Sequence, residues 1–235
     1  MRRSLAVLFT AIVLFASTLT PAAAPLSLSG SSQDRYFLNL NTVGLITCLR
    51  LPDGLGIADL DAMTPDQKAR SRIYTGTGTI IARNRILTAA HVVDHNAACV
   101  FKERIVAVSY LDRRLDMAVL TADLGETPVT PVNCDGLRAG TEYLGFGYAH
   151  GVDFAAQRLT FAGGYADQRL KTGETAYHQA VLGGEAHPGM SGGPIVNGAG
   201  EVVAIFNTGG PKSAGARNLV ETPLCAALQW RTPQP

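Results

Sequence analysis

The stretch Pro188-Gly189-Met190-Ser191-Gly192-Gly193-Pro194 places one serine among three glycines and two prolines. Both residue types disfavour helix interiors, so no regular helix is expected here. Glycine also permits tight turns that aim backbone N–H groups at one point. A serine hydroxyl is a weak nucleophile unless a base takes its proton and donors stabilise the oxyanion. A nucleophilic role for Ser191 therefore requires a histidine and a carboxylate elsewhere in the chain.

Two segments supply these groups in suitable surroundings. His91 follows the apolar, β-prone run 86–90, which predicts an imidazole at the end of a buried strand. Asp116 opens the apolar run 117–120, where a carboxylate is costly to bury unless it is paired. An imidazole N–H is a suitable partner, because holding it leaves the other ring nitrogen free to take the serine's proton. Asp112 and Asp123 are nearby alternatives to Asp116.

Three segments in this order, Thr88–His91, Leu115–Leu120 and Gly189–Pro194, resemble the signature segments of the chymotrypsin/trypsin-like serine endopeptidases. The resemblance spans roughly residues 40–230 and is greatest to compact bacterial members, including the high-temperature-requirement periplasmic proteases. It implies that Ser191 is the nucleophile, His91 the general base and Asp116 the orienting carboxylate. It also implies an oxyanion hole formed by the amides of Gly189 and Ser191.

Chain order excludes two other nucleophile arrangements. Residues 189–193 satisfy G-x-S-x-G, but an α/β-hydrolase needs a histidine after the serine, and none follows Ser191. A subtilisin-like order would take its aspartate from a polar, loop-like stretch before His91. That arrangement also needs a helix directly after the serine, and Gly192-Gly193-Pro194 disfavours one. The aspartates of that stretch are Asp53, Asp59, Asp61 and Asp66.

The predicted fold class is all-β: two six-stranded antiparallel β-barrels packed together, with a C-terminal α-helix. Twenty-five glycines and scarce helical periodicity favour many short strands with tight turns. Strands are expected at 43–48, 73–82, 85–90, 99–101, 104–110 and 116–120, then at 142–148, 157–162, 175–181, 194–196 and 202–207. The expected divisions are a signal peptide (1–24), a flexible N-terminal segment (25–40), a first barrel carrying His91 and Asp116 (41–126), a connector (127–141), a second barrel carrying Ser191 (142–221), and a C-terminal helix and tail (222–235).

The N-terminus has the pattern of an export signal. Arg2 and Arg3 precede an apolar run from Leu5 to Leu14, and the small-residue segment 21–24 follows. The apolar part is shorter than the ~20 residues that a membrane span needs. We therefore expect a secreted or periplasmic protein with no membrane attachment after cleavage.

Four cysteines in an exported chain predict two disulfides, for which three pairings are possible. Cys48 with Cys99 is favoured because both lie in the first half, and the resemblance places the connector against the C-terminal helix, which favours Cys134 with Cys225. A Cys/His metal site is the alternative, but His91-x-x-x-His95 is its only suggestive spacing and no Cys-x-x-Cys occurs. No metal or cofactor is expected.

Charge excludes some partner classes. Without Arg2 and Arg3 the chain has 18 basic and 19 acidic residues, and no basic block suggests nucleic-acid or membrane binding. The expected partner is a polypeptide substrate, and the expected state is a monomer.

The resemblance also bears on specificity. Glu185, six residues before Ser191, matches the position that forms the base of the primary pocket and would favour Lys or Arg before the cut; a solvated turn beside Gly183-Gly184 is the alternative. Asn207-Thr208-Gly209 resembles the segment that pairs with the substrate backbone, and Phe206 or Thr208 is an alternative that would narrow the pocket. Met190 replaces the aspartate of zymogen-activated relatives, so no new N-terminus is needed to shape the oxyanion hole.

The predicted function is a secreted or periplasmic serine endopeptidase that acts through a Ser-His-Asp triad and an acyl-enzyme. The alternative is a catalytically silent trypsin-like protein that uses the cleft for binding or scaffolding. The intact set of Ser191, His91 and Asp116 favours the enzyme.

Overall fold

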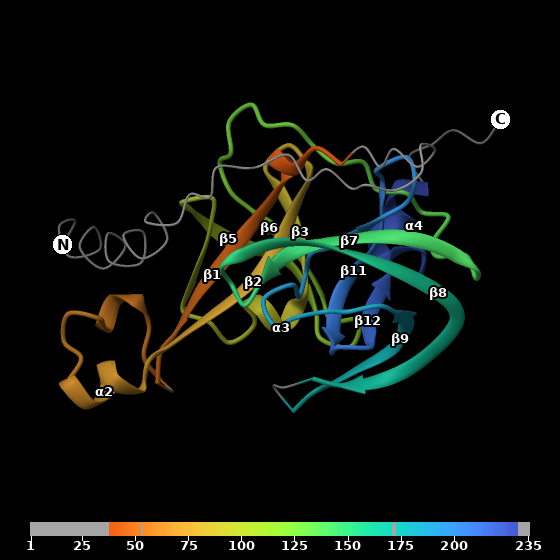
Figure 1. Ribbon diagram of the computed structural model, residues 1–235. Helices are drawn as coiled ribbons and strands as arrows, with labels where there is room; N and C mark the ends of the chain where they lie inside the picture. Colours follow the sequence, from red (N-terminus) through yellow and green to blue (C-terminus); the bar gives the residue numbers. More distant parts are fainter. Residues whose placement is uncertain (1–37, 53, 171–172, 230–235) are drawn as a thin grey trace.

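The computed structural model describes residues 38–52, 54–170 and 173–229. Within them the strands form two closed antiparallel barrels (Figure 1). This confirms the predicted fold class. The expected signal peptide and most of the expected N-terminal segment lie outside the described residues. None of the described helices is long and apolar enough to cross a membrane.

The first barrel has the strand order β1-β2-β3-β6-β5-β4. Its strands are β1 (Val43–Arg50), β2 (Arg72–Ala82), β3 (Arg85–Thr88), β4 (Ala98–Phe101), β5 (Arg104–Asp112) and β6 (Met117–Thr121). Side chains that alternate along the strands fill its interior, among them Ile46, Ile80 and Phe101, each fully buried. Several expected strand ends differ by one or two residues, and two of these differences lie next to proposed site residues: β3 stops at Thr88, with the short helix α3 (Ala90–Val93) after it, and β6 starts one residue after Asp116.

The second barrel has the order β10-β11-β12-β9-β8-β7. Its strands are β7 (Thr141–Ala149), β8 (Asp153–Arg169), β9 (Thr175–Gly183), β10 (Pro194–Val196), β11 (Val202–Gly209) and β12 (Ser213–Asn218). The 3-10 turn η3 (Leu219–Glu221) leads into the C-terminal helix α4 (Pro223–Gln229). β8 is much longer than expected, because register shifts at Phe161/Gly164 and Ala166/Gln168 carry it around the barrel.

The long connection between β1 and β2 projects away from both barrels (Figure 1). It contains the 3-10 turn η2 (Ile57–Asp59) and the helix α2 (Pro65–Arg70), and a third 3-10 turn, η1 (Leu40–Thr42), precedes β1. Thr64 caps α2 by accepting from the Gln67 N–H, and Pro65 takes the first helical position, as its sequence predicts.

Both disulfides have the pairing that the sequence favoured. Cys48–Cys99 joins directly opposite residues of β1 and β4. Cys134–Cys225 ties the connector between the barrels to α4. Each bond closes a long loop, of 51 and 91 residues respectively, so both restrict the unfolded chain strongly.

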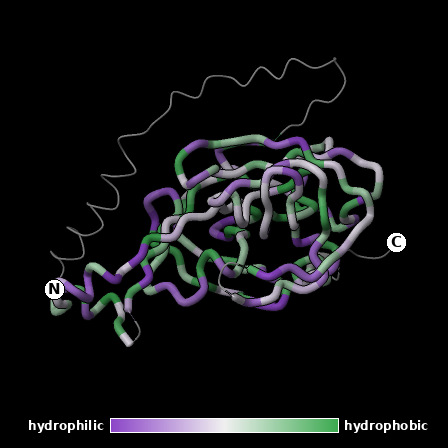
Figure 2. Tube along the Cα trace, turned by 60° about the horizontal axis from the view of Figure 1, so that its bottom comes forward, coloured by the Kyte–Doolittle hydropathy of each residue, from purple (hydrophilic) through white to green (hydrophobic). Residues whose placement is uncertain are grey.

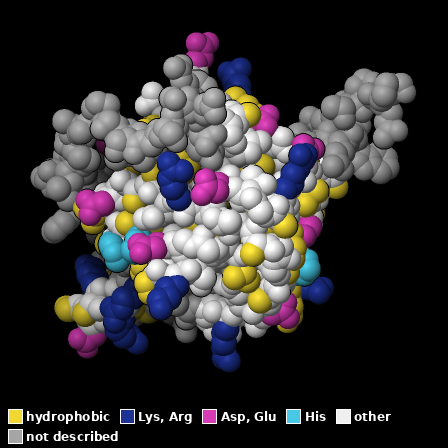
Figure 3. Space-filling view, turned by 45° about the vertical axis from the view of Figure 1, so that its right-hand side comes forward, with side chains coloured by type: hydrophobic (Ala, Val, Ile, Leu, Met, Phe, Trp, Pro, Cys, Tyr) yellow, Lys and Arg dark blue, Asp and Glu magenta, His cyan; other side chains and the backbone are white. Residues whose placement is uncertain are grey.

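The barrels pack through an apolar interface. Leu87, Met117 and Val119 of the first barrel meet Leu144 and Ile205 of the second in one buried cluster. Hydrophobic and hydrophilic residues alternate along the strands in Figure 2, as half-buried strands require. On the face in Figure 3, acidic and basic side chains are interspersed. The described residues on this face therefore form no large patch of a single charge sign.

Candidate active site

Ser191 lies in the turn between β9 and β10, held by both barrels. The Ser191 carbonyl accepts from the Thr77 N–H of β2 at 2.8 Å, and the Gly192 N–H donates to the Phe206 carbonyl of β11 at 2.7 Å. Gly192 has φ +83, and a Cβ there would lie 2.1 Å from Thr88 Oγ1. Only glycine therefore fits beside the serine.

His91 and Asp116 form a close, buried pair within the first barrel. His91 Nδ1 lies 2.8 Å from Asp116 Oδ2, and the His91 backbone N–H donates to Asp116 Oδ1 at 2.9 Å. The Asp116 side chain is 1% exposed and that of His91 18%. Because Nδ1–H is held by the carboxylate, Nε2 is the ring nitrogen available for proton transfer. The two alternative carboxylates have other partners. Asp112 accepts from the backbone N–H groups of Arg114 and Leu115, and Asp123 accepts from the backbone N–H of Gly125.

The second barrel holds Asp116 in place. Asp116 has φ +51, and the Asn207 side-chain amide donates to its Oδ2 at 2.7 Å and to its carbonyl at 2.9 Å. The backbone N–H of Arg217 in turn donates to Asn207 Oδ1 at 3.2 Å. The predicted substrate-binding residue Asn207 thus uses its side chain to support the carboxylate.

The Arg217 guanidinium is 1% exposed and completes this support. Its Nε donates to the Leu115 carbonyl at 2.8 Å, directly before Asp116, and its terminal nitrogens donate to the Tyr177 and His178 carbonyls of β9. Burial lowers the pKa of the Arg217 guanidinium, while Glu221 and Asp116 act in the opposite direction. A buried cation thus ties the Asp116 loop to the second barrel.

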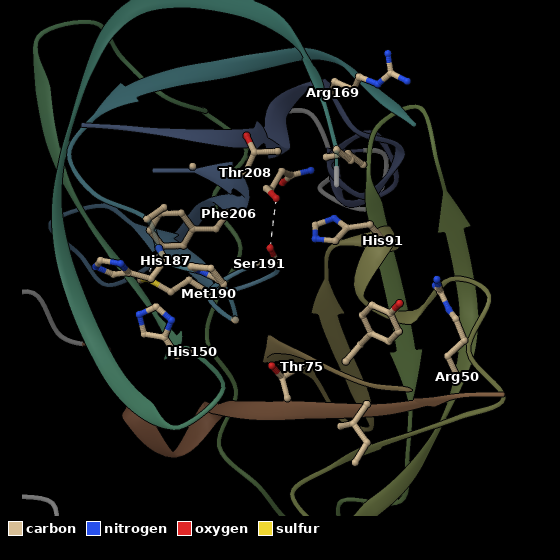
Figure 4. Close-up of a pocket in the computed structure, with 18 residues that line it drawn as sticks. Arg50, Thr75, His91, His150, Arg169, His187, Met190, Ser191, Phe206 and Thr208 are labelled. Atoms are coloured by element: carbon tan, nitrogen blue, oxygen red, sulfur yellow. Dashed lines mark hydrogen bonds between the residues drawn. The ribbon is translucent and has the colours of Figure 1, made fainter. Parts of the chain in front are cut away.

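The Ser191 hydroxyl faces the same cavity as His91 but has a different hydrogen-bond partner. Ser191 Oγ donates to the Asn207 carbonyl at 3.3 Å, the bond drawn in Figure 4. Among the described residues, no hydrogen bond joins this hydroxyl to the imidazole, although the ring lies beside it in Figure 4. Catalytic hydrogen bonds of this kind often form only with substrate bound. Proton transfer would require the hydroxyl to turn from Asn207 toward His91.

Two backbone N–H groups beside Ser191 are available as donors. The Met190 N–H bonds the His187 carbonyl at 3.1 Å across a turn in which Gly189 has φ +92. The Pro188 carbonyl accepts from the His150 N–H. In a trans peptide the C=O and N–H point in opposite directions, so the Gly189 N–H points away from His150. Within the part of the chain that the structure describes, the N–H groups of Gly189 and Ser191 have no acceptor.

The cleft between the barrels has a volume of about 780 Å³ and includes Ser191 and His91. Asn207, Thr208 and Gly209 line it, and so do His150 and His187, whose ring centroids are 5.5 Å apart.

The chain matches the family model described as a trypsin-like peptidase domain over residues 76–205. It belongs to the trypsin-like peptidase family. Among solved structures, the Rv3671c protease from M. tuberculosis in its active form is similar, with 18% identity, a TM-score of 0.63 and 83% of each chain covered. The HtrA-type protease AlgW with a decapeptide matches at 21% identity and a TM-score of 0.57, over 81% of this chain and 63% of that one. No curated protein sequence matches.

Glu185 lies outside the cleft of this trypsin-like peptidase. Its side chain is 53% exposed, and its carboxylate lies 3.5 Å from His187 Nε2. The Ala186 N–H bonds the Gly210 carbonyl at 3.1 Å, and a Cβ on Gly209 would lie 2.4 Å from that of Ala186. The segments at Ala186 and Gly209 are therefore in close contact, and Glu185 is not among the residues that line the cleft.

One cluster in this peptidase has the residue types of a metal site. Asp94, His95 and Glu174 are the one such group in the described residues. The Arg113 guanidinium occupies the position between their carboxylates, with Nε 2.6 Å from Asp94 Oδ2 and 3.8 Å from Glu174 Oε1. The place of a cation between these two carboxylates is therefore already taken by an arginine.

Sequence reasoning missed the buried Arg217. The available signal was a basic residue in the otherwise small and apolar run Ser213–Val220. A charge in such a run indicates either an exposed face or a buried ion with several partners.

Proposed function

We propose that this trypsin-like peptidase is an exported serine endopeptidase that cleaves peptide bonds through an acyl-enzyme. The observation that carries the proposal is the His91–Asp116 pair at 2.8 Å, which leaves His91 Nε2 for the Ser191 hydroxyl in the same cleft. His91 takes the hydroxyl proton as Ser191 Oγ attacks the carbonyl carbon, and then gives that proton to the leaving amine. Water, activated by His91 in the same way, releases the acyl group from Ser191.

The site has a partner for each of the two charges that develop during this reaction: N–H donors for the oxyanion and a carboxylate acceptor for the imidazolium. The N–H groups of Gly189 and Ser191 face the substrate oxygen, which becomes negative in the tetrahedral intermediate. Asp116 accepts from His91 and from Asn207, so it remains an ordered anion that stabilises the imidazolium. Met190 is fully buried and its sulfur accepts from the His187 N–H at 3.5 Å, which supports a loop shaped without a new N-terminus.

Export is proposed from the pattern of residues 1–24 together with the two disulfides, which persist in oxidising compartments. The mature protein would act as a monomer on polypeptides. Sequencing the N-terminus of the exported protein tests this part, and a retained Met1 would contradict it.

A catalytically silent binding protein is the second candidate. The observation that favours it is the Ser191 hydroxyl, which bonds the Asn207 carbonyl and not the imidazole. A silent protein would keep the cleft as a peptide-binding groove without turnover.

Labelling with a fluorophosphonate separates the two functions. The enzyme predicts stoichiometric labelling of the wild type that is lost in Ser191→Ala and strongly slowed in His91→Ala. Ser213→Ala, which changes an exposed serine, is the matched control and should label like the wild type. An unlabelled but folded wild type would refute the enzyme and leave the binding protein.

A further inference from the structure

The cleft is lined by basic groups. Arg50, Arg169, His91, His150 and His187 contribute to its walls, whereas none of the lining residues that the structure describes is a carboxylate. The whole chain is close to neutral, so this bias is local. A cleft lined by one sign of charge attracts ligands of the opposite sign.

Arg50 is a cation of this set whose side chain contacts both the Tyr74 ring and the Asp94 carbonyl. It ends β1 opposite Arg72 of β2, and its guanidinium carbon lies 4.5 Å from the centre of the Tyr74 ring. Its Nη2 donates to the Asp94 carbonyl at 2.9 Å, while Nε is shielded and has no partner among the described residues. A guanidinium has five N–H donors, so most of its capacity is unused. Stacking on Tyr74 fixes the plane in which a carboxylate can bind.

The neighbouring carboxylates do not neutralise Arg50. Asp94 offers Arg50 only its backbone carbonyl, because its carboxylate is bound in a two-pronged pair by Arg113 at 2.6 and 2.9 Å. His95 Nε2 lies 3.2 Å from the same carboxylate. Glu174 is 3.8 Å from Arg113 Nε. Arg50 therefore keeps a positive charge at the wall of the cleft.

The position of Arg50 determines which part of a substrate meets it. Thr208 of β11 lies on one side of Ser191 in Figure 4, Thr75 lies on the opposite side, and Arg50 lies beyond His91. In the proposed reaction β11 pairs with the part of the peptide before the cut bond, which becomes the acyl group. His91 protonates the leaving amine, which begins the part after the cut. The segment after the cut bond therefore passes toward Arg50.

We propose that Arg50 binds a substrate carboxylate on the leaving-group side of the cut bond, so that this peptidase prefers acidic peptide segments there. The inference rests on the proposed function and adds a substrate class to it. Either an Asp or Glu side chain or the C-terminal carboxylate of a short leaving peptide has the required chemistry.

The test uses internally quenched peptides whose cut position has been located by mass spectrometry. Pairs differ only by Glu or Gln at the second or third residue after the cut, and one further pair differs by a C-terminal acid or amide. We expect about a five-fold higher kcat/KM for the acidic member of at least one pair. The pair that responds identifies the source of the carboxylate. The ratio should fall toward one in about 0.5 M NaCl.

Three variants assign the effect to Arg50. Arg50→Gln should abolish the ratio, Arg50→Lys should keep part of it, and Arg85→Gln, which changes an exposed arginine on β3, should leave it unchanged. Fluorophosphonate labelling of each variant reports separately on the fold and on Ser191.

The outcomes distinguish this inference from the proposed function. Equal rates for all pairs with a labelled wild type would overturn the inference alone, and so would a ratio that persists in a labelled Arg50→Gln. A folded wild type that does not label would overturn the proposed function itself. If Arg50→Gln does not fold, the salt dependence of the wild-type ratio decides: a ratio insensitive to salt refutes the charge pairing.

Discussion

Arg217→Met tests whether the second barrel positions Asp116. Methionine retains much of the apolar length of the arginine but donates no hydrogen bond. The carbonyls of Leu115, Tyr177 and His178 would each lose the hydrogen bond from Arg217, although Tyr177 would still accept from Gln179 Nε2, and Glu221 would lose a partner 3.5 Å away. The change therefore affects the segment that carries Asp116 as well as the stability of the fold.

The expected loss of stability follows from these contacts. Three carbonyls that lose a hydrogen bond at about 1 kcal/mol each give about 3 kcal/mol. Glu221 is 30% exposed, so its lost ion pair adds at most about 1 kcal/mol. The free energy of unfolding should fall by about 3 to 4 kcal/mol, which a domain of ordinary stability survives at room temperature.

The catalytic effect is expected to be larger than this loss explains. With the Leu115 carbonyl released, Asp116 and then His91 would shift, and a displacement of about 1 Å costs on the order of 100-fold in rate. Urea unfolding followed by circular dichroism measures the stability, and fluorophosphonate labelling of the folded variant measures the rate. Arg217→Lys keeps the charge but not the planar arrangement of donors. It should therefore recover a larger share of the lost stability than of the lost labelling rate.

Two results would refute this reasoning. If folded Arg217→Met labels as fast as the wild type, Arg217 does not position Asp116. If the free energy of unfolding changes by less than about 1 kcal/mol, the buried hydrogen bonds do not contribute as the contacts indicate.

Three further predictions concern the pocket, the pH dependence and the disulfides. Glu185→Gln should change the rate on peptides with Lys or Arg before the cut by less than about twofold, because its carboxylate is outside the cleft; a larger loss in a peptide panel would contradict this. Burial raises the pKa of the Tyr148 phenol above its ordinary value. The phenol's contribution to the free energy of unfolding is therefore complete below about pH 10 and is lost as the pH rises through the higher pKa of the folded state. Tyr148→Phe should therefore lose less stability than the wild type between about pH 9 and pH 11 in urea titrations, and equal losses would count against a buried phenol. Replacing Cys134 and Cys225 with alanine opens a loop of 91 residues and should lower the free energy of unfolding by about 4 to 5 kcal/mol, whereas a loss below about 1 kcal/mol would argue against this bond.

The fold was predictable because its strands carry local signals. Alternating apolar residues and turn glycines located the strands of the first barrel. The sequence pattern does not single out β12, because its buried positions include Arg217 and Asn218 as well as alanine. A strand that buries polar groups becomes recognisable only when their partners on other strands are known.

Residue order led to His91, Asp116 and Ser191, but not to the contacts between them. The support of Asp116 by Asn207 joins residues 91 positions apart, and the choice of Asn207 as acceptor for the Ser191 hydroxyl is a rotamer that no local pattern encodes. The backbone bond between Ala186, next to Glu185, and Gly210 likewise joins two separate loops. Local composition cannot determine such pairings between distant loops.

The hydrogen bonds from Asn207 and Arg217 to the Asp116 loop also bear on when a newly made chain could become active. Under the proposed function, Ser191 lies in the second half of the sequence and His91 and Asp116 in the first, so neither half alone would carry a complete catalytic centre. Cleavage would then begin only after both barrels have folded and docked.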